Sequence, residues 1–536
     1  VAANTKPVTF EGFTFINEST TSGEGMKASA GTDGSLTLKN CGFRISPTGL
    51  NISGNSGKVL IYNTLFADGG TGLAADGNTT VVNATFAQNT TDLTDKPVVY
   101  NSVAWKHTNQ NLPAGTNNNV AIDGTVANDD VQNGPNFRDP ENGDYRIRPS
   151  VLLLDKGNKD NYLQQVDISS FDNEKDLANN ARLTGDQIDV GAYEYEATLK
   201  PIVYVKADLT GTADGNSWTT ALGDLQGAID LAGIYANGHP DEQAYVFVHN
   251  NYHAASNDQL NLSMPGVKVY GGMNDETSSQ TEVGAIVPDL LGKRKGMLEA
   301  TSRSSLQNVT LGADAVVDGF VVNGTAAVNN GVLSTSVVKN DVSGATLGVL
   351  YNSLVLGDGT AEHPGNVSGV TAVNVTATGT IAAGGNNRAS VTETNSYVTA
   401  DYWKYQLMET DADNLDKGTD ATTQTYINKV GHSRDLIGNK RIRNTVDNGC
   451  FETWNITSNY MITADDKPVG QSVVYVRQGK ELSMAEEVYP EGQNFTPGYL
   501  LLEHQAGLRG NGNYINLNNF AVERNVAAGG NDLAVM

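Results

Sequence analysis

Along residues 1–105, short runs in which apolar and polar residues alternate lead into an asparagine about every twenty residues. These asparagines, Asn40, Asn63, Asn83 and Asn101, are called the asparagine column below. A phenylalanine follows three positions after each of the first three, as Phe43, Phe66 and Phe86. Alternation of this kind predicts strands, and its recurrence with a turn residue and an aromatic predicts a solenoid of β coils.

In such a solenoid, each coil lies on the previous one at the strand spacing of ~4.8 Å, so that like residues stack. The phenylalanines are therefore predicted to fill the interior as a stack. Each column asparagine is predicted to donate its side-chain amide to one neighbouring coil and to accept from the other.

A much larger repeat overlies the short one. Residues 176–194 and 435–452, called the closing segments below, share the pattern Asp-Leu-x-x-Asn-x-Arg followed by Asp-x-Gly-x-aromatic-Glu. A Leu-Asp-Lys-Gly sequence precedes each copy, at residues 154–157 and 415–418. A repeat of about 260 residues is a whole module, and each copy has the turn-rich pattern of a last strand with its approach.

Each closing segment carries one arginine among several carboxylates. We predict that Arg182 bridges acidic residues of its own closing segment, such as Asp176 or Asp189, because a guanidinium can hold two acidic turns together. In the second copy, Arg441 is predicted to bridge Asp435 or Asp447 in the same way.

The second module is predicted to begin with a strand at residues 202–206. After Trp218, the residues Leu222, Leu225, Ala228, Ile229 and Ala232 fall at helical spacing, with Thr219 or Thr220 as the expected N-cap. One short helix here is expected to cap the open edge of the first coil. The strand-then-asparagine pattern returns at Asn340, Asn352, Asn374 and Asn395, and residues 473–477, 499–502 and 514–517 are predicted as further strands.

These patterns together predict an all-β chain of tandem right-handed parallel β-helices. Residues 1–197 are expected to be the C-terminal part of a first β-helix, residues 198–455 a second, complete one, and residues 456–536 the start of a third β module. Because the sequence opens at Val1 in strand pattern, we interpret it as a mature or truncated piece of a longer protein.

The chain resembles the right-handed parallel β-helix surface proteins of Gram-negative bacteria. The sequences at residues 144–147, 154–157 and 189–194 are similar to the end of choice-of-anchor Q type β-helix domains, and residues 204–218 are similar to their start. The second copy departs from this pattern, since Asn448 and Cys450 replace Val190 and Ala192. The resemblance implies the fold and a secreted or surface location, while the activity is left open.

Composition narrows the functional classes. With 35 basic and 60 acidic residues, the net charge of −25 argues against nucleic acid or anionic lipid as a partner. Cys41 and Cys450 are the only cysteines, which excludes a disulfide scaffold and a cysteine-based zinc site. No run of about 18 apolar residues occurs, so no transmembrane segment is expected.

An acidic cluster of Asp411, Asp413, Asp416 and Asp420 is the candidate site for Ca²⁺, which prefers oxygen ligands. Its spacing does not fit an EF-hand loop. Since Asp416 also matches Asp155 of the first copy, a structural turn is the favoured interpretation.

Other candidate groups are weaker. Asp129 and Asp130, with Gly431 and His432, are similar to pieces of β-helix glycosidases, but the two pieces fall in different modules. The basic run Lys293-Arg294-Lys295 is expected in a solvated loop, and His249 and His253 are expected to be surface histidines separated by a turn. The triplets that begin at Asn83 and Asn374 lie at column positions, where a glycan does not fit.

We therefore predict a non-catalytic structural protein of the cell surface, extracellular and associated with the outer membrane. Its expected work is adhesion or surface-layer-like assembly through self-association or contacts with other surface proteins, and surface glycans are a further candidate partner. No catalytic residue and no cofactor is assigned, with Ca²⁺ as the one candidate ion. The alternative is a secreted carbohydrate-active protein, similar to a polysaccharide lyase or glycosidase, or a carbohydrate-binding one.

Overall fold

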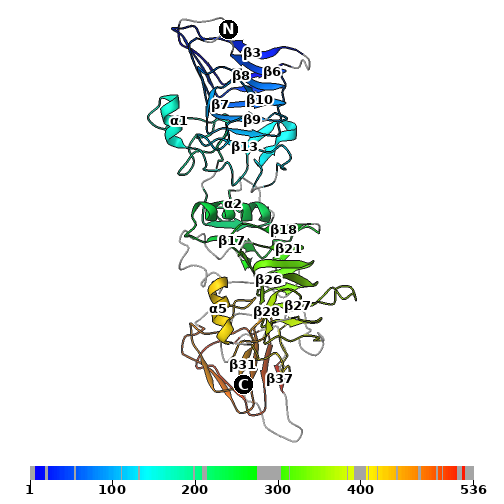
Figure 1. Ribbon diagram of the computed structural model, residues 1–536. Helices are drawn as coiled ribbons and strands as arrows, with labels where there is room; N and C mark the ends of the chain where they lie inside the picture. The colour runs from blue at the N-terminus through cyan, green and yellow to red at the C-terminus, as the bar shows by residue number, and fades with distance from the viewer. Residues whose placement is uncertain are drawn as a thin grey trace. The chain divides into compact units, whose positions relative to one another are not determined.

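The computed structural model describes residues 6–17, 22–52, 56–109, 111–128, 130, 133–196, 199–207, 214–256, 258–273, 304–312, 314–382, 384–391, 406–408, 410–418, 420–441, 445–468, 472–489, 493–497, 499–515 and 522–524. The chain forms two compact units, Val1–Leu199 and Lys200–Met536, which are described separately. Both units are built mainly from strands in parallel sheets (Figure 1). The predicted all-β class is therefore correct. The predicted separation of residues 456–536 from residues 198–455 stays a prediction.

The first unit contains parallel sheets that are extended by each successive coil. One sheet has the order β1 (Val8–Glu11), β4 (Ser35–Lys39), β7 (Lys58–Ala67), β9 (Thr79–Ala87), β12 (Val103–Trp105) and β13 (Val120–Ile122), with β2 (Thr14–Ile16), β5 (Gly42–Arg44) and β11 (Val98–Tyr100) attached. A second has the order β10 (Thr91–Thr94), β8 (Thr71–Ala75), β6 (Thr48–Ile52) and β3 (Glu24–Ala28). The buried side chains of both sheets share one core, in which Leu38 and Ile61 meet Leu50 and Leu73.

The predicted phenylalanine stack is confirmed. Phe43 lies opposite Phe66, and Phe66 opposite Phe86, in the parallel register. Their ring centroids are 5.3 and 5.0 Å apart with nearly parallel planes, and Phe15 extends the stack at 4.9 Å from Phe43. The ring spacing follows the strand spacing because each ring comes from a successive coil.

The backbone conformation explains why asparagine recurs in the asparagine column. Asn40, Asn63, Asn83 and Asn101 have φ between 48° and 51°, in the left-handed region that asparagine tolerates better than most residues. The register places each directly after a paired strand position, so that the chain bends at the same point in every coil.

After the coils, the first unit ends in shorter elements. The strands β14 (Phe137–Asp139) and β15 (Asp144–Ile147) form an antiparallel pair around the 3₁₀ turn η1 (Pro140–Asn142). The helix α1 (Lys159–Val166) follows and packs beside the sheet through Tyr162, whose ring lies 6.2 Å from that of Tyr62 (Figure 1).

The second unit repeats the parallel arrangement. One sheet has the order β16 (Ile202–Val205), β17 (Ala244–His249), β19 (Val267–Met273), β22 (Val316–Asp318), β24 (Ala326–Ser334), β26 (Val342–Tyr351), β28 (Thr371–Val373) and β30 (Gly384–Gly385), with β18 (Gln259–Leu262) and β21 (Asn308–Leu311) attached. Another has the order β20 (Ser305–Leu306), β23 (Val321–Val322), β25 (Val337–Val338), β27 (Leu354–Val355) and β29 (Thr376–Ala377).

A left-handed column recurs in this unit, but its members differ in part from the prediction. Asn352 and Asn374 belong to it, with φ of 46° and 53°. The preceding coil places Thr335 in the column, with φ of 48°, and Asn340 is not a member of the column although a strand precedes it as predicted. The strand before Asn340 belongs to the other sheet, and a pattern of strand followed by asparagine does not distinguish the two. Asn395 lies outside the described residues.

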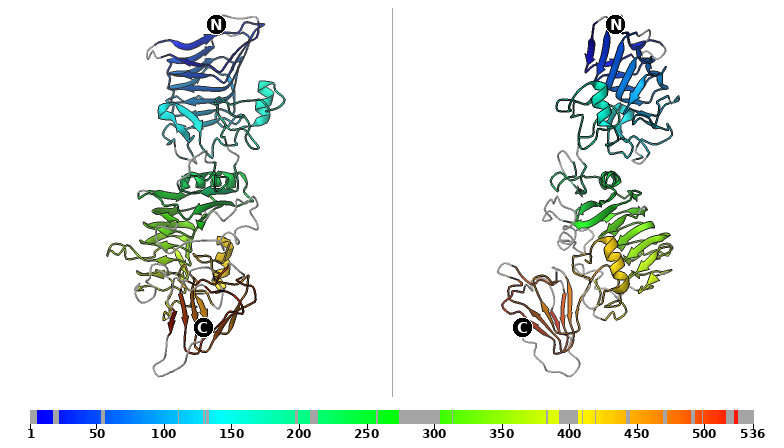
Figure 2. Two further views of the ribbon diagram at one scale, coloured as in Figure 1. Left: turned by 180° about the vertical axis from the view of Figure 1, so that it is seen from behind. Right: turned by 60° about the vertical axis from the view of Figure 1, so that its left-hand side comes forward.

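The predicted capping helix exists as α2 (Leu225–Gly238), which lies across the end of the second unit's stack beside β17 (Figures 1 and 2). Its N-cap is Asp224, whose carboxylate accepts from the N–H groups of Gln226 and Gly227, so Thr219 and Thr220 were wrong as caps. Leu222 is not helical, because its backbone makes a parallel bridge to Val205.

Helices α1 and α5 (Asp420–Val430) were not predicted. Both follow a Leu-Asp-Lys-Gly sequence, and both place a tyrosine against the residue that precedes a column asparagine. Tyr426 of α5 lies 5.1 Å from Tyr351, as Tyr162 lies against Tyr62. These helices are short and polar except for one packed face, and their signal is therefore weak in the sequence.

The C-terminal strands form two further parallel sheets of the second unit (Figure 2). Their orders are β31 (Trp454–Ile456), β33 (Val473–Val476), β35 (Tyr499–Leu502), β37 (Val522–Arg524), and β32 (Tyr460–Ile462), β34 (Glu481–Met484), β36 (Gly507–Arg509). The predicted strands at residues 473–477 and 499–502 are confirmed. In the described part of the chain, every helix is too short or too polar to cross a lipid bilayer.

Candidate functional site

The closing segment of the first unit is a buried network of carboxylates and backbone amides. The Asp189 carboxylate accepts from the N–H groups of Asp155 and Tyr195, at 2.7 and 2.6 Å. Asp176 accepts from Asn180 and Glu194, at 2.7 and 2.8 Å. Glu194 in turn accepts from the Asp189 N–H at 3.1 Å, so the carboxylates and turns hold one another in place.

The closing segment of the second unit repeats these bonds position by position. Asp447 accepts from Asp416 and Thr453, both at 2.7 Å. Asp435 accepts from Asn439 and Glu452, at 2.7 and 2.9 Å. The Asp447 N–H donates to Glu452 at 3.1 Å. The sequence repeat is therefore a repeat of one hydrogen-bonded structure.

Each closing segment docks on the column of its own unit. The Gly191 N–H donates to the carbonyl oxygen of Asn101 at 2.8 Å, and the Gly449 N–H donates to that of Asn374 at the same distance. Asn83 donates its side-chain amide to the carbonyl oxygens of Asp189 and Gly191.

The predicted ladder of asparagine side chains is thus correct only in part. Asn101 donates to Asn83 at 3.2 Å and Asn374 donates to Asn352 at 3.0 Å, as expected. Asn63, however, donates to Tyr162 and to the carbonyl oxygen of Lys175, which lie outside the coils. The column amides serve mainly to fasten the later part of the unit, a role that the short repeat alone does not reveal.

Arg182 lies inside the first network and is fully buried. Its guanidinium donates to the carbonyl oxygen of Asp189 at 2.6 Å and lies 3.6 Å from the Glu194 carboxylate. The predicted ion pair with an acidic residue of the same closing segment is therefore present, with Glu194 as the partner. Arg441 is also buried and donates to the carbonyl oxygens of Gly449 and Asn352.

Burial dominates the protonation of these carboxylates. It raises the pKa of Asp189 to about 7 and the pKa of Glu194 to about 9, against the opposing effect of Arg182 and the backbone N–H groups. Burial likewise raises the pKa of Asp447 to about 7. In the first unit, Asp176, Asp189 and Glu194 are buried with one guanidinium, that of Arg182. Their negative charges exceed its single positive charge unless some of the carboxyl groups keep their protons.

The acidic cluster at residues 411–420 is engaged in turns. The Asp411 carboxylate accepts from the N–H groups of Asp413 and Asn414, and Asp413 pairs with Arg388 at 2.8 Å. Asp416 accepts from the side chain of Asn455 at 2.7 Å, and Asp420 begins α5. Among the described residues, no group of three or more histidine, cysteine or acidic side chains is placed to hold a metal ion. A site for Ca²⁺ stays a prediction.

The glycosidase-like pieces belong to different units. His432 is buried, lies 3.1 Å from Asp318 and accepts from the Arg434 N–H at Nδ1. Because Nδ1 accepts, Nε2 carries the proton toward Asp318. Asp130 belongs to the other unit, where it accepts from Asn133. Asp129 and the run Lys293-Arg294-Lys295 lie outside the described residues.

His249 and His253 lie in different surroundings. His249 ends β17, is buried, and its Nδ1 lies 2.7 Å from the Asn251 side chain, so the expectation of a surface histidine was wrong there. His253 is exposed, with Nδ1 3.0 Å from the Ser305 hydroxyl. The predicted turn between them is present.

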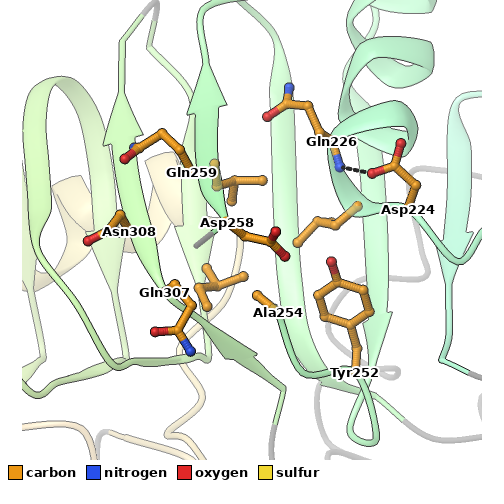
Figure 3. Close-up of a pocket in the computed structure, with 11 residues that line it drawn as sticks. Asp224, Gln226, Tyr252, Ala254, Asp258, Gln259, Gln307 and Asn308 are labelled. Atoms are coloured by element: carbon orange, nitrogen blue, oxygen red, sulfur yellow. Dashed lines mark hydrogen bonds between the residues drawn. The ribbon is translucent and has the colours of Figure 1, made fainter. Parts of the chain in front are cut away.

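A cleft that the sequence did not reveal lies beside the N-terminus of α2. It has a volume of about 140 Å³, and its walls come from α2, β18, β20, β21 and the chain after β17. Figure 3 shows the Tyr252 hydroxyl and the Asp258 carboxylate directed toward its middle. The buried side chains of Leu225, Leu260 and Leu306 form its apolar floor.

Four residues with amide side chains also line the cleft, with their amide groups toward its outer side (Figure 3). They are Gln226, Gln259, Gln307 and Asn308. Gln226 is fixed by bonds to both backbone groups of Asn261, and Gln259 donates to Thr310 at 3.2 Å. Because the residues that line the cleft are spread from Asp224 to Asn308, no local pattern brings them together. No signal in the sequence marked the cleft.

Comparison with known proteins adds no relative: no family model, no curated protein and no solved structure matches this chain.

Proposed function

We propose that the chain consists of right-handed parallel β-helices and works as a non-catalytic structural protein of a bacterial cell surface. In-register parallel pairing of successive strands supports the solenoid, as between β7 and β9 or between β24 and β26. A right-handed path of the coils is supported by the right-handed connections that parallel strands have in nearly all known proteins. The resemblance to choice-of-anchor Q domains supports the surface location, extracellular and associated with the outer membrane.

The observation that carries the proposal is the identical fastening of both units. In each, buried carboxylates organise the closing segment, and a glycine N–H fixes it to a column asparagine. These carboxylates are groups that an enzyme could present to a substrate, but here they accept hydrogen bonds from backbone N–H groups inside the protein. Such repeated internal fastening suits modules that resist unfolding.

The partners proposed are further copies of the chain or other surface proteins. The net charge of −25 keeps the protein soluble and mutually repelling until a specific contact or a cation bridges two surfaces. Ca²⁺ is the proposed bridging ion. Surface glycans are a further partner, and a carbohydrate-active or carbohydrate-binding protein remains the alternative function.

Sedimentation velocity of the full chain, with and without Ca²⁺, tests the assembly. The proposal predicts larger species that increase with protein concentration, and a chelator should reverse any part that depends on Ca²⁺. In parallel, the protein is incubated with neutral and acidic polysaccharides and the release of reducing or unsaturated ends is followed. Turnover that a single Asp, His or Lys substitution abolishes without unfolding the protein would overturn the proposal.

A further inference from the structure

We infer that the cleft beside α2, centred on Tyr252 and Asp258, binds a neutral sugar residue of a glycan. This inference rests on the glycan partner proposed above and names a site for it, while it does not depend on self-assembly. It rests on the size, the charge and the hydrogen-bonding groups of the cleft.

The size limits what the cleft can take. Its volume of about 140 Å³ lies below the roughly 300–1,000 Å³ of sites that enclose a whole drug-sized ligand, so it has room for a single residue of a longer molecule at most. The cleft is partly open to solvent, as a residue within a longer glycan chain requires. The leucine floor offers an apolar surface for the C–H face of a sugar ring.

The charge excludes an anionic ligand. Of the described residues that line the cleft, none is basic, whereas Asp224 and Asp258 are acidic. Both oxygens of Asp224 already accept N–H groups of α2. Asp258 uses one oxygen for the Ala255 N–H at 2.7 Å, so its other oxygen is the acceptor that faces the cleft. A phosphate, sulfate or uronate would meet this carboxylate without a compensating cation.

The remaining groups suit hydroxyls. A sugar hydroxyl both donates and accepts, and side-chain amides and phenols offer both roles. In the described part of the chain, the Gln307 amide and the Tyr252 hydroxyl donate no hydrogen bond to another residue. The Tyr252 phenol is directed toward the middle of the cleft (Figure 3). Asn308 uses only its oxygen, for Thr325, and leaves its NH₂ group for a ligand.

A cationic amine is the competing ligand, because one carboxylate dominates the centre. The amides at the rim favour the neutral sugar, since they add hydrogen-bonding capacity and no charge. A matched set of glycans that differ in charge therefore distinguishes a neutral sugar from a cationic amine as the ligand.

The test uses the full chain on an array of immobilised oligosaccharides. Neutral glucan, mannan, galactan and arabinan fragments are compared with chitosan oligomers, which carry amines, and with pectin and alginate fragments, which carry uronates. Multivalent display makes weak single-site binding visible. Titration calorimetry with the best oligosaccharide then gives an affinity in solution.

The inference predicts binding to at least one neutral class, with at least a tenfold loss of affinity in Tyr252→Ala and in Asp258→Ala. Tyr252→Phe and Asp258→Asn are the conservative variants, which keep the packing and test the hydroxyl and the charge if the alanine variants unfold. Matched controls are Tyr514→Ala and Gln164→Ala, exposed residues outside the cleft that should leave binding unchanged.

Binding of the amine or uronate class alone would overturn the inference. So would neutral binding that all four cleft variants retain, or the absence of binding to the whole array. None of these outcomes concerns assembly or turnover, so a failure here is distinguishable from a failure of the structural proposal.

Discussion

The side-chain amide of Asn83 donates to the carbonyl oxygen of Gly191, which lies 108 residues later in the chain, at 3.1 Å. One residue of an early coil therefore holds the segment that ends the unit. The same contact explains why column positions favour asparagine. The residue must adopt a left-handed backbone and must also carry a donor that reaches outward.

Removing Arg182 is predicted to destabilise the first unit strongly. Arg182→Ala leaves Asp176, Asp189 and Glu194 buried without their cation, which typically costs several kcal/mol (~3–5). Denaturant unfolding of the full chain should show this loss. Arg441→Ala should affect the second unit in the same manner. Arg138→Ala, which removes a partly exposed ion pair with Glu196, is the control and should cost little.

The column asparagines are predicted to matter for two separable reasons. Asn83→Gly keeps the left-handed backbone but leaves the Asp189 and Gly191 carbonyl oxygens without the amide, for an expected loss of ~2 kcal/mol. Asn83→Ala adds backbone strain and should lose more. Asn109→Ala, at an exposed position, is the control. Equal stability of Asn83→Gly and the original protein would contradict the fastening role.

Thr335 marks a position where stability can be gained. Its φ of 48° is strained for a β-branched residue, whereas Asn352 opposite it in the next coil has a similar φ with a suitable side chain. Thr335→Asn is therefore predicted to raise stability by ~1 kcal/mol, seen as a higher melting temperature. Thr335→Ser, which removes only the branch, should lie between the two. A lower melting temperature for Thr335→Asn would count against the column as a backbone requirement.

Stability should fall as pH rises through neutrality. The pKa values of Asp189 and Glu194 are about 7 and about 9 in the folded protein, above the values of ~4 expected in an unfolded chain. Between these values the folded state binds more protons, so the free energy of unfolding falls with increasing pH. Melting temperatures measured from pH 5 to pH 9 should decrease.

Glu194→Gln separates this effect from general charge repulsion. The variant removes one buried titrating group, and its melting temperature should depend less steeply on pH, whatever its absolute stability. An unchanged slope would show that the closing segment does not set the pH dependence.

Much of the fold was predictable because the parallel register copies local chemistry from coil to coil. Phe43, Phe66 and Phe86 recur at one position after a column asparagine, and their stack followed directly. The closing segments were recognisable as a pair because their hydrogen bonds require the same Asp, Asn and Arg at the same spacing.

The remainder depended on contacts between residues far apart in the sequence. Asn63 donates to Tyr162 and to the carbonyl oxygen of Lys175, which lie about a hundred residues later in the chain. No local sequence pattern connects these residues. The left-handed backbone conformation of Thr335 was not predictable, because threonine rarely adopts it. The α2 cleft was missed for the same reason, since Tyr252 and Gln307 meet only through the register of the coils.

Hydrogen–deuterium exchange of the full chain tests most directly whether both closing segments are equivalent fastenings. The amides of Thr184, Asp189 and Glu194, and those of Asp447, Glu452 and Thr453, should exchange as slowly as the core strands. In Arg182→Ala, exchange should accelerate in residues 176–194 and remain slow in residues 435–452. Rapid exchange of either segment in the original protein, or acceleration of both segments in the variant, would contradict the account.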